Sequence, residues 1–395
     1  MKVRLVAAAV LTLTSVGVVA MPRASADGPG SGAQWVVTVG DSAISGEAGR
    51  WAGNTNGAAS RTDASGADTY FDNATRTAEQ NAGCHRSESA EAHIGGGVNS
   101  LNLACSGART YTFTASNGNF KPGLDFAAGS QLQALQSFAA TNNVRAVSVL
   151  IGANNYGFAD IVQTCITNFL TSPSWWKNYC YDDSSIASRF TAAAQAARTA
   201  EVAGALGRVR QAMANAGYAD NAYTIIVQTY SSPVPSASGV RYAESGFTRQ
   251  TVGGCGLWNR DFDWANSTVV PAMNNSLING AAASGVPNYV ILNTTNALVG
   301  RRLCERTVGL LEERGIATWQ SPGAVDVTEW VHQVRTASTI VGPYQLQEDG
   351  HPNYWGQLAL RNCLRQAFNG GAVRGGTCTP GKGLNSNGEP KMNFG

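Results

Sequence analysis

Ser42 is the first residue of the chain whose type and setting could support covalent chemistry. It follows the valine-rich run VVTV and ends the triplet Gly40-Asp41-Ser42, where that run stops abruptly. A serine hydroxyl is a weak nucleophile until a positioned base accepts its proton. Taken alone, Ser42 is better explained as a turn serine that ends a strand, so a chemical role requires a base elsewhere in the chain.

The best candidate for that base is His351. The chain has four histidines, and His351 lies between Glu348-Asp349-Gly350 and Pro352, directly before a helical pattern. Histidine is the side chain that most often takes up and returns a proton in catalysis. Together with this histidine, Ser42 could form a nucleophile and base pair.

Other candidate groups are explained without chemistry. Cys84, His85, Glu91 and His93 carry metal-ligand side chains, but their spacing matches no familiar metal site. His332 is interpreted as a packed or surface histidine. The pair at residues 175–176, Trp-Trp, could form an aromatic lip over a site or a packed insertion, and the sequence favours neither.

Four apolar segments rich in β-branched residues predict the strands that would position these residues. They are residues 34–39, 144–151, 223–229 and 289–293. Helical patterns cover residues 186–216, 262–283 and 353–368. Strands that alternate with helices indicate a parallel sheet covered on both faces. Ligands should then bind beyond the carboxyl ends of the strands, at residues 40–42, 152–155 and 230–233.

The N-terminus predicts export. Lys2 and Arg4 precede an apolar stretch over residues 5–20, which Ala24-Ser25-Ala26 closes. This is the pattern of a secretory signal peptide over residues 1–26, cleaved after Ala26. The apolar run is short for a membrane span of about 20 residues, so we expect a secreted protein without stable membrane insertion.

The mature chain should be close to neutral. Cleavage removes three basic residues and no acidic one, which leaves 25 basic residues of the original 28 against 26 acidic ones. Nucleic-acid-binding proteins usually carry a strong basic excess or a basic stripe. No basic cluster is longer than Arg301-Arg302, so we expect no nucleic-acid partner. The protein is expected to be a monomer.

Eight cysteines in an exported chain predict disulfides rather than metal ligands. Their spacing falls into four successive pairs: Cys84–Cys105, Cys165–Cys180, Cys255–Cys304 and Cys363–Cys378. No low-complexity linker interrupts the chain, so we expect one domain over residues 27–378, with its longest polar insertion at residues 46–82. Residues 379–395 have little to bury and are predicted to form a disordered tail.

Four blocks, taken in order, resemble the SGNH hydrolases, also called GDSL esterases and lipases. They are Gly40-Asp41-Ser42 with Gly46, Asn102-Leu103-Ala104-Cys105-Ser106-Gly107, Gly152-Ala153-Asn154-Asn155, and Glu348-Asp349-Gly350-His351-Pro352. The third block departs from the family, which usually has an aspartate at the position of Asn155. The blocks span nearly the whole mature chain, and the first three cysteine pairs also resemble the secreted bacterial lipase and esterase branch.

The resemblance implies a three-layer α/β/α, flavodoxin-like fold with a central, mostly parallel sheet. It also implies carboxylic ester hydrolysis through an acyl-enzyme on Ser42, with His351 as general base and no metal or organic cofactor. The oxyanion would be held by the main-chain N–H groups of Ser42 and Gly107 and by the side-chain amide of Asn154. Without the resemblance, Gly107 would be an ordinary turn glycine and Asn154 a helix N-cap.

The acid that orients the imidazole stays open. The family's aspartate lies three residues before the histidine, where this chain has Glu348, and Asp349 lies two residues before it. Some secreted members use a backbone carbonyl instead. A carboxylate is the favoured partner here, and Glu348 is preferred slightly because of its position.

The substrate also stays open, because the family covers simple esters, lipids, phospholipids, acetylated sugars and plant polymers. The expected partner is a small-molecule or lipid ester substrate. The alternatives are a hydrolase of acetylated glycans, and a secreted binding protein that kept the fold but has little or no activity. A glycosidase with paired carboxylates is a further alternative, with Asp41 and Asp349 as the two acids, although no motif supports it.

Overall fold

The computed structural model describes residues 28–335 and 348–395 of the 395-residue chain. The signal peptide expected over residues 1–26 lies outside the described residues. None of the helices in the described part of the chain is long and apolar enough to span a membrane.

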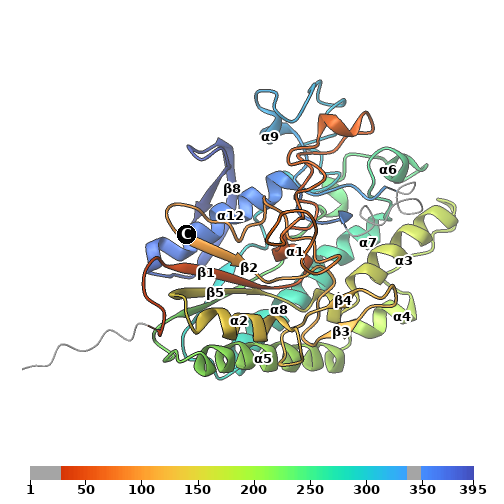
Figure 1. Cartoon of the computed structure of the whole chain (residues 1–395). Coiled ribbons are helices and arrows are strands. Elements are labelled where there is room, and N and C mark those ends of the chain that lie inside the picture. The colour runs from red at the N-terminus through yellow and green to blue at the C-terminus, as the bar shows by residue number, and fades with distance from the viewer. Residues whose placement is uncertain (1–27, 336–347) are drawn as a thin grey trace, which may run out of the picture.

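The fold is a mixed α/β fold built on a seven-stranded sheet (Figure 1). The strand order is β2-β1-β5-β6-β7-β8-β9, and all neighbours are parallel except the last pair. The strands are β1 Trp35–Gly40, β2 Asn99–Asn102, β5 Val144–Leu150, β6 Thr224–Gln228, β7 Tyr289–Asn293, β8 Gly376–Leu384 and β9 Pro390–Phe394. β3 Phe113–Thr114 and β4 Phe120–Lys121 form a separate antiparallel pair. The four strands predicted from apolar runs are therefore confirmed as β1, β5, β6 and β7.

Both faces of the sheet are buried, as the continuous apolar runs predict. In β1, Val37 and Val39 belong to one hydrophobic core, whereas Val36 belongs to another. Side chains alternate between the faces of a strand, so these two cores lie on opposite faces. The first core includes residues of three helices, α2 Gln131–Ala139, α5 Ala192–Asn215 and α8 Val270–Ala283; the second includes α12 Tyr354–Phe368.

The predicted helices form, with shifted starts. The long one begins at Ala192, where the side chain of Thr191 accepts a hydrogen bond from Ala194 N–H, and not at residue 186. The pattern over residues 262–283 is divided into α7 Asn259–Trp264, a π-helix Ala265–Val269 and α8. The remaining α-helices are α1 Ser42–Ser45, α3 Phe158–Thr171, α4 Ser184–Ala187, α6 Thr248–Thr251 and α9 Ala324–Val327.

Short 3-10 helices complete the described secondary structure. They are η1 Ala59–Arg61, η2 Ala153–Asn155, η3 Ser188–Phe190, η4 Ala237–Gly239 and η6 Asn369–Gly371. η2 matters most for the site, because it directly follows the carboxyl end of β5 and carries Asn154.

The prediction of a disordered tail over residues 379–395 is wrong. This segment forms most of β8 and all of β9, an antiparallel pair at one edge of the sheet. Met392 and Phe394 pack against the second core, and Arg365 of α12 forms an ion pair with Glu389. These few apolar side chains are enough to order the segment because Cys378, near the start of β8, forms a disulfide with Cys363 of α12.

The four disulfides predicted from cysteine spacing are all present: Cys84–Cys105, Cys165–Cys180, Cys255–Cys304 and Cys363–Cys378. No free cysteine remains among the described residues. Four disulfides are consistent with a secreted protein.

Candidate active site

The end of β1 positions Ser42. Gly40 has φ +147°, and a Cβ there would lie 2.0 Å from the main-chain oxygen of Leu150, so only glycine fits this close approach. Asp41 then caps α1, because its carboxylate accepts a hydrogen bond from Ala43 N–H at 3.2 Å. Ser42 is thereby fixed as the first residue of a short helix at the carboxyl edge of the sheet.

His351 lies against Ser42. Its Nε2 is 2.7 Å from Ser42 Oγ, and its Nδ1 is 3.1 Å from the main-chain oxygen of Asp349. A carbonyl can only accept, so Nδ1 must carry the proton and Nε2 is left free to accept the serine proton. The tautomer required of a general base is therefore set by the main chain.

The loop that carries His351 is held by His332. The main-chain N–H of His332 donates to His351 O at 2.8 Å, and Gly350 N–H donates to His332 O at 3.1 Å. The imidazole of His332 is buried, and burial lowers its pKa to about 3. His332 is thus a packed, neutral histidine, in agreement with its sequence interpretation.

Neither carboxylate expected to orient the imidazole does so. Glu348 accepts hydrogen bonds from Trp51 Nε1 at 2.8 Å and Tyr70 Oη at 2.5 Å, and Asp349 contacts the imidazole through its carbonyl and not its carboxylate. The preference for Glu348 is therefore wrong, and the third alternative, a backbone carbonyl, describes the geometry. The reason is long-range: the aromatic donors that turn Glu348 away belong to the insertion at residues 46–82.

A buried ion pair lies next to Ser42, and no sequence pattern predicts it. The main-chain N–H of Glu47 donates to Ser42 O at 3.2 Å, and its carboxylate lies 2.7 Å from His85 Nδ1. Burial alone would raise the pKa of Glu47, but His85 lowers it overall. His85, weighed above as a metal ligand, instead pairs with this acid and lies 3.5 Å from Glu79.

These charges influence the base. Burial lowers the pKa of His351 below its ordinary 6.5, and Glu47 is the strongest opposing influence. The imidazole therefore stays neutral, and able to accept a proton, to a lower pH than a solvent-exposed histidine would.

The residues expected to hold an oxyanion come from three segments. Asn154 follows β5 in η2 and lines the same pocket as Ser42 and His351. Its Nδ2 donates to Ala108 O at 3.0 Å, which places the loop of Gly107 beside it. Gly107 has φ +78° and does not itself line the pocket. Thus Ser42, Asn154 and His351 line one pocket, and Gly107 lies outside its lining, next to the Ala108 carbonyl that Asn154 contacts.

Asn155, the departure from the family pattern, supports that loop. Its Oδ1 accepts from Thr110 N–H at 3.2 Å, and its Nδ2 donates to Thr110 Oγ1 and Glu201 Oε2, each at 2.8 Å. These contacts tie the end of β5 to the loop at residues 107–110 and to α5.

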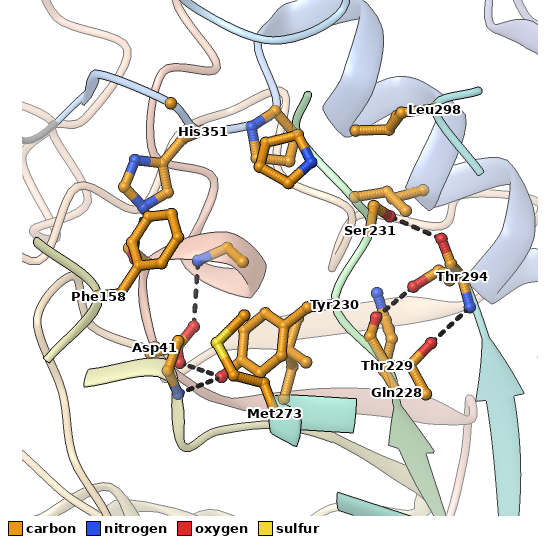
Figure 2. A pocket seen from close by; sticks show the side chains of 18 of the residues that line it. Asp41, Phe158, Gln228, Thr229, Tyr230, Ser231, Met273, Thr294, Leu298 and His351 are labelled. Carbon is orange, nitrogen blue, oxygen red and sulfur yellow. Dashed lines mark hydrogen bonds between the residues drawn. The ribbon is translucent and has the colours of Figure 1, made fainter. Parts of the chain in front are cut away.

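The pocket at Ser42 has an empty volume of about 610 Å³, with the open solvent at its mouth included, and its walls are mostly apolar (Figure 2). Phe158, Met273 and Leu298 line it, and the ring centroids of Phe158 and His351 are 6.4 Å apart. At the base, Tyr230 donates to the Asp41 carboxylate, whose pKa burial raises to about 7. Asp349 does not line this pocket, so the paired-carboxylate alternative lacks its second acid.

Trp175 and Trp176 do not fit either interpretation offered for them. Their exposed fractions are 82% and 73%, and neither lines the pocket at Ser42. Within the described ranges, no group of three or more His, Cys, Asp or Glu side chains is placed to hold a metal ion.

Glu91 is a buried acid beside the pocket, and it gives the protein a predictable pH dependence. Its Oε2 accepts from Gln228 Nε2 at 2.7 Å, and Gln228 lines the pocket. Burial raises the pKa of Glu91 from 4.5 to about 8. The folded protein therefore binds more protons than the unfolded chain between these values, so this stabilisation is full below pH 4.5 and is lost as the pH rises through 8.

Replacing Glu91 by glutamine should remove that dependence, because the amide cannot ionise. Relative to wild type, Glu91→Gln should gain up to about 1.4 kcal/mol in free energy of unfolding for each pH unit across this window. Urea unfolding of both proteins at several pH values measures the difference. Parallel pH curves for the two proteins would show that Glu91 titrates normally in the fold.

The chain is similar to solved structures, but comparisons with protein families and curated proteins find no match. Among solved structures, the chain is similar to phospholipase A1 from Streptomyces albidoflavus NA297, with a TM-score of 0.44 and 20% sequence identity. The similarity covers 85% of this chain and 99% of that one.

Proposed function

We propose that this protein is a secreted serine hydrolase of the SGNH type that cleaves carboxylic ester bonds through an acyl-enzyme on Ser42. The observation that carries the proposal is the placement of His351, with Nε2 at 2.7 Å from Ser42 Oγ and Nδ1 on the carbonyl of Asp349. A buried serine does not need a correctly oriented base for packing, whereas acyl transfer does.

The mechanism follows from these contacts. Ser42 Oγ attacks the ester carbonyl carbon while His351 Nε2 takes its proton. The same imidazole then returns the proton to the departing alcohol, which leaves the acyl group on Ser42. A water molecule, deprotonated by His351, hydrolyses this ester and restores the serine.

Hydrogen-bond donors near Ser42 stabilise the negative charge on the oxygen of the tetrahedral intermediate. The main-chain N–H groups of Ser42 and Gly107 and the side-chain amide of Asn154 form the oxyanion hole in this proposal. Glu47 supplies negative charge close to the imidazolium that forms during the reaction, in the absence of a carboxylate on Nδ1.

The two cores on opposite faces of the sheet support a three-layer α/β/α arrangement of the SGNH type.

A substrate screen tests the proposal. The purified mature protein should hydrolyse p-nitrophenyl esters, and parallel assays with phosphatidylcholine and acetylated xylan separate lipid esters from acetylated glycans. Hydrolysis of none of the three classes would overturn the proposed function and favour the alternative of a binding protein on the same fold.

The carbonyl geometry leads to a prediction about the two acids before His351. Glu348→Gln should change kcat by less than about tenfold, since the replacement does not move the Asp349 carbonyl. It should lower the free energy of unfolding by about 1–3 kcal/mol, because it disturbs buried bonds to Trp51 and Tyr70. Steady-state kinetics and denaturant unfolding measure the two effects separately.

Asp349→Asn is the matched comparison, because it alters the neighbouring carboxylate and keeps the main chain. It too should stay within about tenfold of wild type in kcat. A loss of several orders of magnitude in either variant, with the fold intact, would show that a carboxylate stabilises the imidazolium directly.

A further inference from the structure

A second cavity adjoins the pocket at Ser42. Its empty volume, with the open solvent at its mouth included, is about 660 Å³, and its walls are almost entirely apolar. We call it the side chamber. It shares Phe158, Pro233 and Gly350 with the pocket at Ser42, so the two spaces meet next to the catalytic histidine.

The side chamber lies between α3 and the chain segments that follow β6. Ile161, Val162 and Ile166 line it from α3, and Val234 and Leu257 line it from the opposite side. An apolar space of this kind gains free energy from taking hydrocarbon out of water, and it offers little to a sugar or a charged group.

The one acidic residue in its lining does not change this character. Asp261 Oδ1 accepts from the main-chain N–H groups of Cys180 and Tyr181, each at 3.1 Å. The carboxylate is fully buried and thereby serves to fix the end of the Cys165–Cys180 loop.

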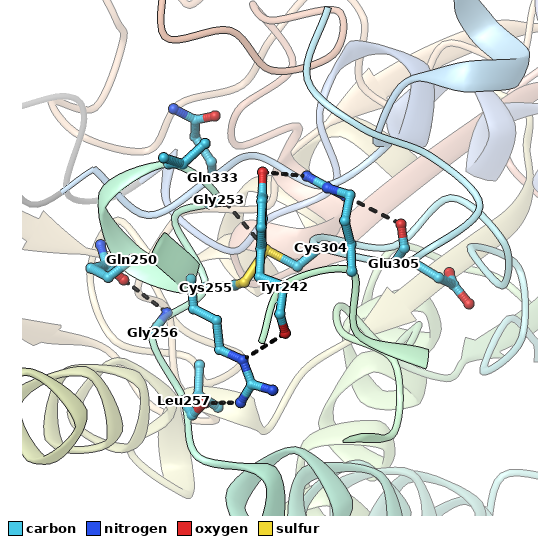
Figure 3. The surroundings of a disulfide bond; sticks show 12 residues. Tyr242, Gln250, Gly253, Cys255, Gly256, Leu257, Cys304, Glu305 and Gln333 are labelled. Atoms are coloured by element: carbon cyan, nitrogen blue, oxygen red, sulfur yellow. Dashed lines mark hydrogen bonds between the residues drawn. A yellow bond between two sulfur atoms is a disulfide. The ribbon is translucent and has the colours of Figure 1, made fainter. Parts of the chain in front are cut away.

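The walls are braced before any ligand binds. Cys165 on α3 and Cys255 on the facing loop both line the side chamber, and each is in a disulfide. Arg249 donates to Leu257 O at 2.8 Å, and Gly256 N–H donates to the side chain of Gln250 at 2.9 Å (Figure 3). These contacts hold the loop at residues 253–257 in place, so little ordering is required on binding.

We propose that the side chamber binds the hydrocarbon chain of the ester substrate. The inference rests on the proposed function and adds a substrate class to it: esters that carry a medium-length or long alkyl chain. Because Phe158 lies at the junction beside His351, a chain that enters the chamber leaves its ester group at Ser42. The chain can belong to the acid or to the alcohol of the ester, and the test separates the two.

The expected effect is a gain with chain length. Each buried methylene should raise kcat/KM by about fourfold until the chamber is full. Wild type should therefore prefer p-nitrophenyl decanoate to p-nitrophenyl acetate if the chamber takes the acyl chain. It should prefer decyl acetate to ethyl acetate if the chamber takes the alcohol chain.

Variants that fill the chamber test this on two walls. The variants are Ile161→Trp on α3 and Val234→Phe on the opposite wall. Each should lower the ratio of kcat/KM for the long-chain ester to kcat/KM for the short-chain ester at least tenfold. The decrease should occur in the acyl series if the chamber takes the acyl chain, and in the alcohol series if it takes the alcohol chain. Gln163→Trp is the matched control, because Gln163 lies on the exposed side of the same helix. The control should leave both ratios unchanged.

The outcomes separate this inference from the function on which it rests. A lower ratio in either filling variant, with no change in the control, supports the side chamber and identifies the chain that it binds. Wild-type ratios in every folded filling variant would overturn it while ester hydrolysis persists. If wild type hydrolyses no ester at all, the proposed function fails first.

Discussion

Replacing Ser42 by alanine is expected to lower kcat for ester hydrolysis by about a millionfold, with the fold unchanged. Removing the nucleophile of a serine hydrolase has an effect of this order, because nucleophile and base act as one unit. For the same reason, Ser42→Ala/His351→Ala should lose no more activity than either single variant. Steady-state kinetics on a p-nitrophenyl ester measures kcat, and thermal unfolding of each variant shows whether the fold is unchanged.

Ser45 supplies the matched control on the same helix. Its hydroxyl donates to Ser42 O at 3.0 Å and to His85 O at 3.3 Å, so it is a structural serine next to the candidate nucleophile. Ser45→Ala should cost about 1 kcal/mol of stability and keep activity within about tenfold of wild type. Near-wild-type activity in Ser42→Ala would contradict the assignment of the nucleophile.

The second large effect is expected at Asn154. Asn154→Ala should lower kcat by about 10²–10³-fold and leave KM nearly unchanged, because an oxyanion donor acts mainly in the transition state. Single-turnover and steady-state kinetics with a soluble ester separate the two parameters.

Asn155→Ala is the comparison for that experiment. Asn155 is bonded to Thr110 and Glu201, so its loss should weaken the loop and cost stability, with a smaller decrease in kcat. A raised KM with unchanged kcat in Asn154→Ala would show that the amide binds the substrate and does not stabilise the oxyanion.

The strands and the pairing of cysteines could be predicted because their signals are local. A valine-rich, mostly apolar run such as residues 144–150 favours a strand buried on both faces, and β5 indeed contributes to the two cores, with Ala146 in one and Val147 in the other. Each of the four bridges joins two successive cysteines, at separations of 15 to 49 residues.

The features that were missed depend on contacts that neither the composition of a segment nor the pattern of its side chains shows. The tail is ordered by α12, through the Cys363–Cys378 bridge and the Arg365–Glu389 ion pair, which the composition of the tail does not show. The orientation of His351 is likewise set by a main-chain oxygen, which leaves no trace in the side-chain sequence.

The buried pair of Glu47 and His85 illustrates the same limit. Its two residues are 38 positions apart and surrounded by small polar residues, a context typical of loops. Only the fold shows that the pair is enclosed beside Ser42. A fully buried acid and base next to a candidate nucleophile are a sign of function that requires coordinates to recognise.

Labelling with an organophosphonate tests the central claim most directly, because the probe reacts with an activated serine and needs no knowledge of the substrate. Mass spectrometry of the labelled and digested wild-type protein should find a single adduct, on the peptide that contains Ser42. Labelling should be absent in Ser42→Ala and strongly slowed in His351→Ala, while Ser45→Ala is labelled like wild type. An adduct on a different serine, or ester hydrolysis that survives complete labelling of Ser42, would contradict the assignment of Ser42 as the nucleophile.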